Sequence, residues 1–279
     1  MTAVNISVLV LTFNESINIH QCLESLRWSD DVVVLDSHST DATVQIAHDA
    51  GARVYQRVFD NYAAQRNFGL ECIQYRHPWV LMVDADERVP TDFRDELLAA
   101  TREAGSAVTL FLMRRRDHLF GRWLKRSSGY PTWFGRLARV GHVWVEREIN
   151  EEYHTSGESR RLQGHLDHYP FNKGFSAWIG KHDRYSSLEA ILLAETARDS
   201  LRLSAIWDAD PSKRRKALKA VLYALPARPL VVFLGLYVLK LGFLDGRAGF
   251  TFSALRAWYE YMIDCKRREL LRRGKGLPV

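Results

Sequence analysis

The sequence predicts an α/β fold built on a mostly parallel sheet with helices on both faces. In the first hundred residues, short apolar runs alternate with segments of helical pattern. The runs are continuously apolar, which is typical of strands buried on both faces. One run, residues 79–84, ends in Asp84, and Asp86 follows two positions later. Because open α/β sheets bind ligands just outside the carboxyl ends of their strands, this edge is the predicted site.

The elements follow one another in a regular order. Strands are predicted at residues 6–11, 31–36, 52–56, 79–84 and 107–113. Helices are predicted near residues 16–26, 42–50, 61–71 and 91–103. Gly51 ends the second helix, because glycine accepts the left-handed conformation that commonly closes a helix.

The second part of the chain is less regular. A basic, aromatic segment at residues 114–131 predicts an irregular loop over the site. Strand-like pieces follow at residues 133–140 and 142–145, and a helix near residues 175–195 closes this part. We therefore predict one domain over residues 1–205 and a separate helical region over residues 206–279.

Composition places the chain among globular proteins, since 47% of its residues are hydrophobic and 26% are charged. The N-terminus runs straight into a predicted strand, so we expect no signal peptide. Three cysteines, odd in number and widely spaced, fit a reducing cytosol and form no metal or disulfide framework.

Charge is divided unevenly along the chain. Residues 213–279 carry 15 Lys and Arg against 4 Asp and Glu, a net +11, whereas residues 1–212 carry 24 against 29, a net −5. Residues 230–244 are apolar except for Lys240, yet these fifteen residues fall short of the roughly 20 that span hydrocarbon. We predict that this basic and apolar region, with an amphipathic helix at residues 251–270, lies on an anionic membrane surface. The alternative is a helical hairpin packed on the body of the protein or on a second copy of the chain.

Polar residues follow successive predicted strands. Thr12, Phe13 and Glu15 follow the first strand, Asp36 ends the second, and Arg66 lies on the helix before the fourth. Two carboxylates at such an edge suit Mg²⁺ or Mn²⁺, which take oxygen ligands from protein, water and substrate phosphates. An acidic turn that begins the next helix is the ordinary alternative for Asp84 and Asp86 alone.

Since no glycine-rich loop is present, a dinucleotide fingerprint and a P-loop are excluded. The polar side chains at these strand ends suit a nucleotide whose diphosphate is held by a metal. We expect no nucleic-acid partner.

Four motifs together resemble glycosyltransferase family 2. They are VLTFNE at 10–15, VLDS with STD at 34–37 and 39–41, AQRN at 64–67, and VDADE at 83–87. Within this family the chain most resembles the bacterial lipopolysaccharide-core β-1,4-glucosyltransferase group, and FLDGRAGF at 243–250 is similar to a stretch typical of that group. Position 38 departs from the pattern, because a small residue such as glycine is more usual than His38.

The resemblance implies a GT-A fold, Rossmann-like, with a nucleotide-sugar half at about residues 1–110 and an acceptor half at about 111–205. It implies transfer from a UDP-sugar with inversion. On this sequence the resemblance places Arg66 near the phosphates, Asp84 near the ribose and the metal, and Asp86 on the metal. Four residues would surround the nucleoside, namely Thr12, Phe13, Glu15 and Asp36.

Inversion by direct displacement needs one general base aimed at the acceptor hydroxyl. The acidic cluster at residues 146–152 is the place to look, and Glu151 is the predicted base with Glu148 in reserve. His168 is a candidate third metal ligand, with His165 as its alternative, since imidazole is a tolerable ligand for Mn²⁺.

The resulting hypothesis is an enzyme on the cytoplasmic side, bound peripherally to the inner face of the bacterial inner membrane. It would move a sugar, glucose in the first instance, from UDP to a glycolipid such as the heptose of the lipopolysaccharide inner core. Basic residues between 114 and 126 are candidates to face a phosphorylated lipid acceptor. The alternatives are a polyprenyl-linked or capsule acceptor and, from another class, a catalytically idle nucleotide-sugar-binding membrane scaffold. A further alternative is that the chain forms a homo-oligomer through its C-terminal helices.

Overall fold

The computed structural model describes residues 4–146, 152–196, 214 and 227–279. The chain divides into two compact units. Unit 1 comprises residues 1–118 and 130–172, and unit 2 comprises residues 119–129 and 173–279, each in its described part.

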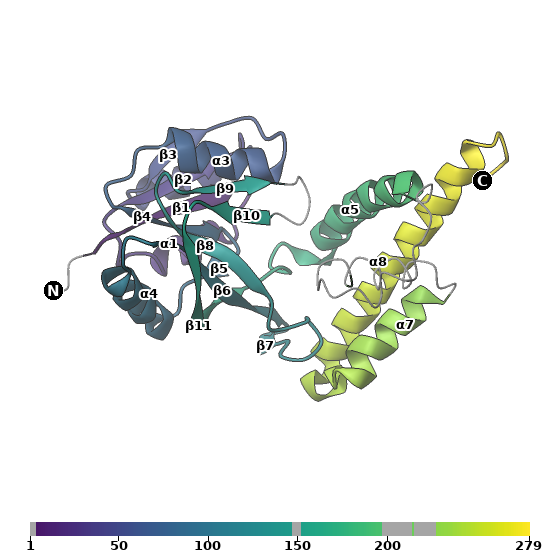
Figure 1. The fold of residues 1–279 in the computed structure, drawn as a ribbon. Helices are drawn as coiled ribbons and strands as arrows, with labels where there is room; N and C mark the ends of the chain where they lie inside the picture. Colours follow the sequence, from purple (N-terminus) through teal and green to yellow (C-terminus); the bar gives the residue numbers. More distant parts are fainter. Residues whose placement is uncertain (1–3, 147–151, 197–213, 215–226) are drawn as a thin grey trace. The chain divides into compact units, whose positions relative to one another are not determined.

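Unit 1 is built on a mixed sheet in the order β3–β2–β1–β4–β8–β6–β11–β5 (Figure 1). Its first four strands are parallel, namely β1 (Ile6–Thr12), β2 (Val32–Asp36), β3 (Arg53–Gln56) and β4 (Trp79–Asp84). β8 (Trp133–Arg139) runs antiparallel to both β4 and β6 (Val108–Leu119). β11 (Glu158–His168) pairs in parallel with β6 and antiparallel with the short β5 (Glu87–Arg88). The predicted α/β class is confirmed.

Two apolar cores cover the two faces of this sheet. On β1, Val8 and Val10 belong to the core that contains α1 (Ile19–Glu24), α2 (Thr43–Asp49) and α4 (Thr91–Glu103). The intervening Leu9 belongs to the opposite core, with α3 (Tyr62–Cys72) and β9 (Val143–Glu146). β9 pairs with β10 (Glu152–Thr155) in a separate small sheet. Because successive strand residues point to opposite faces, a continuously apolar strand such as β1 fills both cores.

The predicted irregular loop at residues 114–131 is wrong in its first third, because β6 continues as a strand to Leu119. The reason is pairing on both sides, with β8 and with β11. Two basic side chains of this strand are paired with carboxylates. Arg115 lies 3.2 Å from Asp117 and Arg116 lies 2.6 Å from Asp167. These two arginines are therefore held inside unit 1 rather than in a solvated loop.

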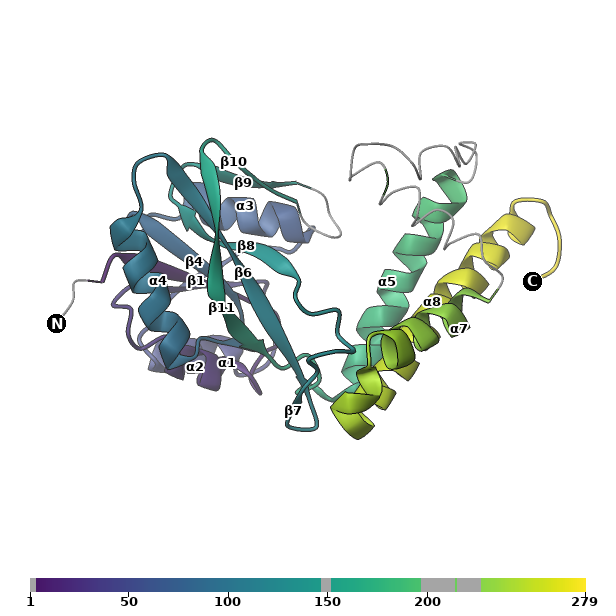
Figure 2. The same cartoon turned by 60° about the horizontal axis from the view of Figure 1, so that its bottom comes forward.

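Unit 2 is helical apart from the two-residue strand β7 (Arg122–Trp123). Its elements are α5 (Gly174–Thr196), α7 (Arg228–Leu234), the π-helical turn η2 (Gly235–Leu239), the 3₁₀ turn η3 (Gly242–Asp245) and α8 (Gly246–Arg273). Both α5 and α7 pack along α8, as Figure 2 shows. The predicted helix at residues 251–270 is confirmed as part of α8.

Side chains on α5 and α8 join these two helices. Lys266 pairs with Asp183 at 2.6 Å, and the ring of His182 stacks on Trp178 and meets the ring of Tyr259 edge-on. Burial holds the pKa of His182 down to about 4. The sequence places this helix within the predicted domain of residues 1–205, and in the structure α5 packs along α8. The predicted boundary at residues 205–206 lies outside the described residues.

Among the described helices, none is by itself long and apolar enough to cross a bilayer. The segments Arg228–Leu239 and Gly242–Arg273, bent by 71°, reach that length and composition only as a pair.

Candidate active site

The loops after β1 and β2 are joined at the carboxyl edge of the sheet. Thr12 donates its hydroxyl to Asp36 at 2.9 Å, and Asp36 is fully buried. Asn14 accepts a hydrogen bond from the backbone N–H of Thr40 at 2.8 Å, and the backbone N–H of Glu15 donates to Thr43 at 2.7 Å. The parallel register that sets Thr12 opposite Asp36 produces this junction. Two predicted donor-binding segments thus form one rigid corner.

Phe13 and Glu15 lie at the open side of this corner. The Phe13 ring is 55% exposed, which is unusual for a phenylalanine at the end of a buried strand. Glu15 accepts a hydrogen bond from the Asn18 amide at 2.9 Å. An exposed aromatic ring can stack on a nucleobase, and a carboxylate can accept hydrogen bonds from the N–H groups of the base or the hydroxyls of the ribose.

His38 occupies the position where the family pattern favours glycine. Its φ is +58°, in the left-handed region that disfavours most side chains. The preference for glycine therefore has a backbone cause.

Asp84 lies between two buried arginines. Arg66 on α3 donates to one of its carboxylate oxygens at 2.9 Å, and Arg136 on β8 donates to the other at 2.7 Å. Burial by itself would raise the pKa of Asp84, but Arg136 and Arg66 outweigh burial and hold it well below its usual range. The backbone N–H of Asp84 also donates to Glu87 at 2.9 Å. Asp84 is therefore an anion held in place, and in this structure its carboxylate oxygens accept hydrogen bonds from the two arginines.

Asp86 faces His168, which the sheet brings beside it. The register of β5 with β11 sets His168 opposite Glu87, and the register of β6 with β11 sets it opposite Asp117. His168 Nε2 lies 3.3 Å from an Asp86 oxygen, while His168 Nδ1 lies 2.6 Å from an Asp117 oxygen. Burial and Arg115 lower the pKa of His168, but Asp86 and Asp117 outweigh them and raise it to about 9. The imidazole is thus protonated at neutral pH and clamped between two carboxylates.

These residues fit a divalent cation in part. Within the described ranges, no three His, Cys, Asp or Glu side chains converge as a complete metal site. Asp86 and the Nε2 atom of His168 supply two ligands once the imidazole proton is displaced. Two protein ligands are enough for a cation that takes the rest of its shell from a diphosphate and water. Asp84, the other predicted ligand, is engaged by arginines, so its role on the metal stays a prediction.

Both predicted bases, Glu151 and its reserve Glu148, lie outside the described residues. The flanking strands β9 and β10 are described, and Glu146 pairs with Glu152 across them. The assignment of the base stays a prediction.

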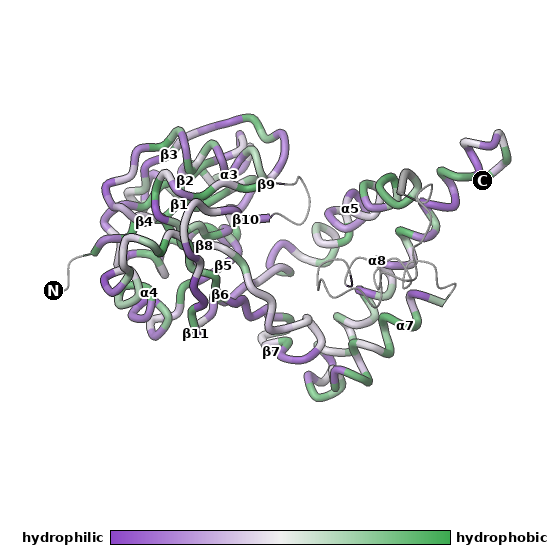
Figure 3. The backbone as a smooth tube through the Cα atoms, in the orientation of Figure 1, coloured by the Kyte–Doolittle hydropathy of each residue, from purple (hydrophilic) through white to green (hydrophobic). Residues whose placement is uncertain are grey.

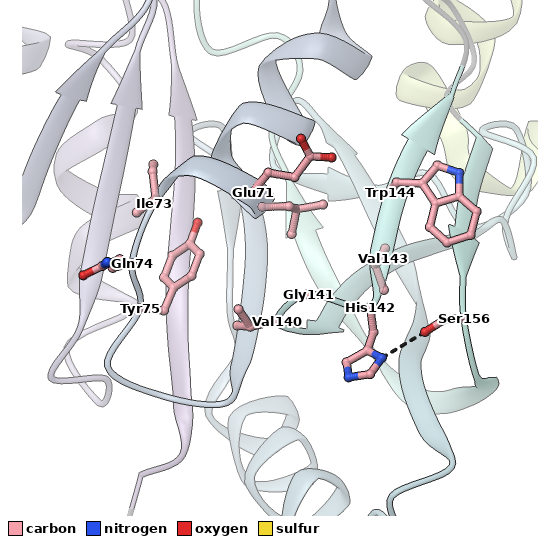
Figure 4. Close-up of a pocket in the computed structure, with 11 residues that line it drawn as sticks. Glu71, Ile73, Gln74, Tyr75, Val140, Gly141, His142, Val143, Trp144 and Ser156 are labelled. Atoms are coloured by element: carbon pink, nitrogen blue, oxygen red, sulfur yellow. Dashed lines mark hydrogen bonds between the residues drawn. The ribbon is translucent and has the colours of Figure 1, made fainter.

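A cavity of about 680 Å³ opens at the other edge of unit 1 (Figure 4). Tyr75, just before β4, and Val140, just after β8, line it, and His142 bonds to Ser156 at 2.9 Å on its wall. Since Asp84 is at the far end of β4, this cavity is not the candidate active site.

Residues 7–176, more than half of the chain, match the family model described as "Glycosyl transferase family 2". The chain belongs to this family. Its edge with Asp84 and Asp86 is accordingly the candidate active site of a glycosyltransferase, and the mixed sheet with its flanking helices is of the GT-A type.

Two relatives with similar sequences are both named as glycosyltransferases. An uncharacterized glycosyltransferase of Rickettsia prowazekii is 26% identical over 95% of this chain and 87% of its own length. LpsC of Rhizobium meliloti, a lipopolysaccharide core biosynthesis glycosyltransferase, is 36% identical over 42% of this chain and 44% of its own.

The fold also matches a solved structure over most of its length. The mannosyltransferase PcManGT from Pyrobaculum calidifontis, in complex with GDP-Man and Mn²⁺, superposes with a TM-score of 0.53. The match covers 94% of this chain and 86% of PcManGT at 16% identity. At that identity it supports the fold alone.

Sequence reasoning missed Arg136, Glu87 and Asp117 in the site of this transferase. Arg136 lies 52 positions from Asp84, and only the pairing of β4 with β8 brings the two together. One signal was available. A charged residue beside Leu137 and Ala138 in an apolar strand predicts a buried partner, because an unpaired buried charge is costly.

Proposed function

We propose that the chain is a metal-dependent, inverting hexosyltransferase that moves glucose from UDP-glucose to a glycolipid acceptor. The observation that supports it best is the meeting of Asp86 with His168 beside the Asp84–Arg66 pair. A cation-binding pair and a guanidinium at one sheet edge are the chemistry that a nucleoside diphosphate requires.

The donor would occupy the corner formed by the loops after β1 and β2. Phe13 would stack on the base, while Thr12, Glu15 and Asp36 would line the nucleoside pocket. Arg66 would reach the diphosphate by exchanging its bond to Asp84, and Arg136 would then keep Asp84 compensated. This exchange would allow an anionic ligand to enter without leaving a buried carboxylate unpaired.

Asp86 and His168 would hold Mg²⁺ or Mn²⁺. The cation would offset the charge that develops on the departing diphosphate. The acceptor hydroxyl would attack the anomeric carbon from the face opposite the diphosphate, so that one C–O bond forms as the other breaks. Glu151, or else Glu148, would take the hydroxyl proton.

The acceptor would be a glycolipid such as the heptose of the lipopolysaccharide inner core. The support is the relationship to LpsC, a lipopolysaccharide core glycosyltransferase. We place the enzyme on the cytoplasmic face of the bacterial inner membrane, bound peripherally. Loss of one hexose from the core glycolipid of a deletion strain, measured by mass spectrometry, is the expected result. Unchanged masses of the core glycolipid, together with an altered polyprenyl-linked or capsule glycan, would refute the core acceptor and assign the altered glycan as the acceptor instead.

Donor and metal are tested by thermal shift with UDP-glucose, UDP-galactose and GDP-mannose, each with and without Mn²⁺. Donor at about 100 times its Kd stabilises by about 2.7 kcal/mol, so we expect a shift of several degrees with UDP-glucose and Mn²⁺ together. Asp86→Ala should abolish the Mn²⁺-dependent part and lower transfer by about 100-fold or more. Asp49→Ala, an exposed carboxylate on α2, is the matched control and should change neither. Full Mn²⁺-dependent turnover by Asp86→Ala would refute the metal assignment, and donor binding with no transfer to any glycolipid would favour the idle scaffold.

A further inference from the structure

An apolar surface lies at the bend between α7 and α8 in unit 2. We call it the bend surface, and it is formed by Leu234, Val238, Leu239, Leu241, Phe243 and Leu244. All six side chains are exposed, with Leu239 81% exposed. Much of α7, which leads into the bend, is green in Figure 3. A cluster of this size is unusual on a protein surface and marks an interaction site.

The bend is tightly packed from behind, so its apolar side chains are directed outward by a fixed backbone. A Cβ atom on Gly249 would lie 2.1 Å from the carbonyl oxygen of Gly242, so only glycine allows α8 to pass so close to η3. The Tyr237 ring contacts the rings of Phe233 and Phe250 at centroid distances of 5.4 and 5.6 Å.

Asp245 fastens residues 119–129 to the bend. Its carboxylate accepts hydrogen bonds from the backbone N–H groups of Arg126 and Ser127, and from the Ser127 hydroxyl, each at 2.9 Å. Arg122 donates to the carbonyl oxygen of Leu244 at 3.0 Å. This attachment sets a basic segment beside the apolar surface.

The charge around the bend surface has one sign. Residues 119–129 and 227–259 contain a single acidic residue, Asp245, and it is buried. Four cations in the same ranges are exposed, namely Arg122, Lys125, Lys240 and Arg247. Exposed apolar side chains flanked by exposed cations match the two layers of an anionic membrane, whose acyl chains lie beneath phosphate headgroups.

We infer that the bend surface inserts into one leaflet of an anionic membrane, with its apolar residues among the acyl chains and the four cations at the headgroup phosphates. A second copy of the chain is a poorer occupant. A symmetric contact would bring the same cations together across the interface with no exposed carboxylate in these ranges to meet them. The inference adds to the proposed function the part of the chain that reaches the lipid phase, and it rests on that function only for the nature of the acceptor.

The test is flotation of the full chain, without donor or acceptor, on vesicles of phosphatidylcholine alone or with one third phosphatidylglycerol. The wild type should float with the anionic vesicles. Leu239→Ser/Leu244→Ser should weaken the partition at least about 10-fold, because two apolar side chains no longer leave water. Lys125→Gln/Lys240→Gln/Arg247→Gln should weaken it about 100-fold on anionic vesicles, since each cation near the surface is worth about a factor of five.

Val58→Ser is the matched control, because Val58 is 72% exposed in unit 1 and should not alter flotation. Every variant should keep its melting temperature, since only exposed side chains change. Undiminished flotation of both bend variants would overturn the inference. So would sedimentation showing a wild-type dimer that Leu239→Ser/Leu244→Ser dissociates while vesicle binding persists.

Failure here is distinguishable from failure of the proposed function. A chain that turns over UDP-glucose but does not float would remove the inference and leave the transferase. A chain that floats through the bend surface but binds no nucleotide-sugar would do the reverse.

Discussion

Units 1 and 2 differ in the kind of energetically costly side chain that gathers at one place in each. In unit 1, buried charges meet at the carboxyl edge of the sheet, where Asp84 lies between Arg66 and Arg136. Unit 2 exposes apolar side chains such as Leu239 over a rigid bend and surrounds them with cations. A buried ion pair adds little net stability, and an exposed apolar cluster adds none. Features that stability does not explain indicate function, so each unit should have its own ligand.

Removing one buried charge partner should strongly destabilise unit 1. Arg136→Met should lower the free energy of unfolding by about 3–5 kcal/mol, because Asp84 and Glu87 lose a buried counter-charge. Urea denaturation measures it. Arg94→Met, which breaks the exposed pair with Asp95, is the control and should cost less than about 1 kcal/mol. Equal losses in the two variants would mean that the Asp84 cluster is not a compensated buried network.

Removing Asp117 should have a smaller effect, on the metal binding that we propose for unit 1. Asp117 is 2.6 Å from His168 Nδ1, so it fixes which ring nitrogen faces Asp86. Asp117→Asn should weaken Mn²⁺ binding about 10- to 100-fold, as loss of a carboxylate behind a histidine ligand does elsewhere. Electron paramagnetic resonance of Mn²⁺ in the presence of UDP reports it without turnover.

Asp167→Asn is the matched control for Asp117. Asp167 also contacts a histidine, His118 at 3.2 Å, and pairs with Arg116. It should leave Mn²⁺ affinity within about twofold of wild type. An equal loss in both variants would point to general loosening of β6 and β11 instead of a histidine held for the metal.

Acid should lower the free energy of unfolding slightly through His182 in unit 2. Burial lowers the pKa of His182 to about 4, against about 6.5 in the unfolded chain. A group with a depressed folded pKa contributes stability above pH 6.5 that is lost as pH falls towards 4. After allowance for partial exposure, we expect a loss of about 1 kcal/mol between these values. The pH dependence of urea unfolding measures it, and His182→Gln should flatten the slope in this range. An unchanged slope in that variant would assign the acid sensitivity to other groups.

Much of the fold was predictable because its signals are local. The parallel strands β1 to β4 and helices α2 to α4 follow from apolar runs and helical periodicity. The strand β11 escaped prediction, since Glu158–His168 is polar along most of its length and is a strand through its pairing with β6 and β5. For the same reason the Arg115 region was predicted as a loop although it lies in β6.

The family could be read from the four motifs, and the sheet class from the apolar runs. The edge where chemistry is expected followed as well, because Thr12, Asp36 and Asp84 each stand at the end of an apolar run. How these residues are paired depends on the packing of distant parts of the chain. This packing places Asp84 between arginines from α3 and β8, and it places His168 between Asp86 and Asp117. It also turned residues 230–244 into an outward-facing bend. Strand register and helix packing join residues far apart in the chain, and no local pattern encodes which charges will meet across a sheet.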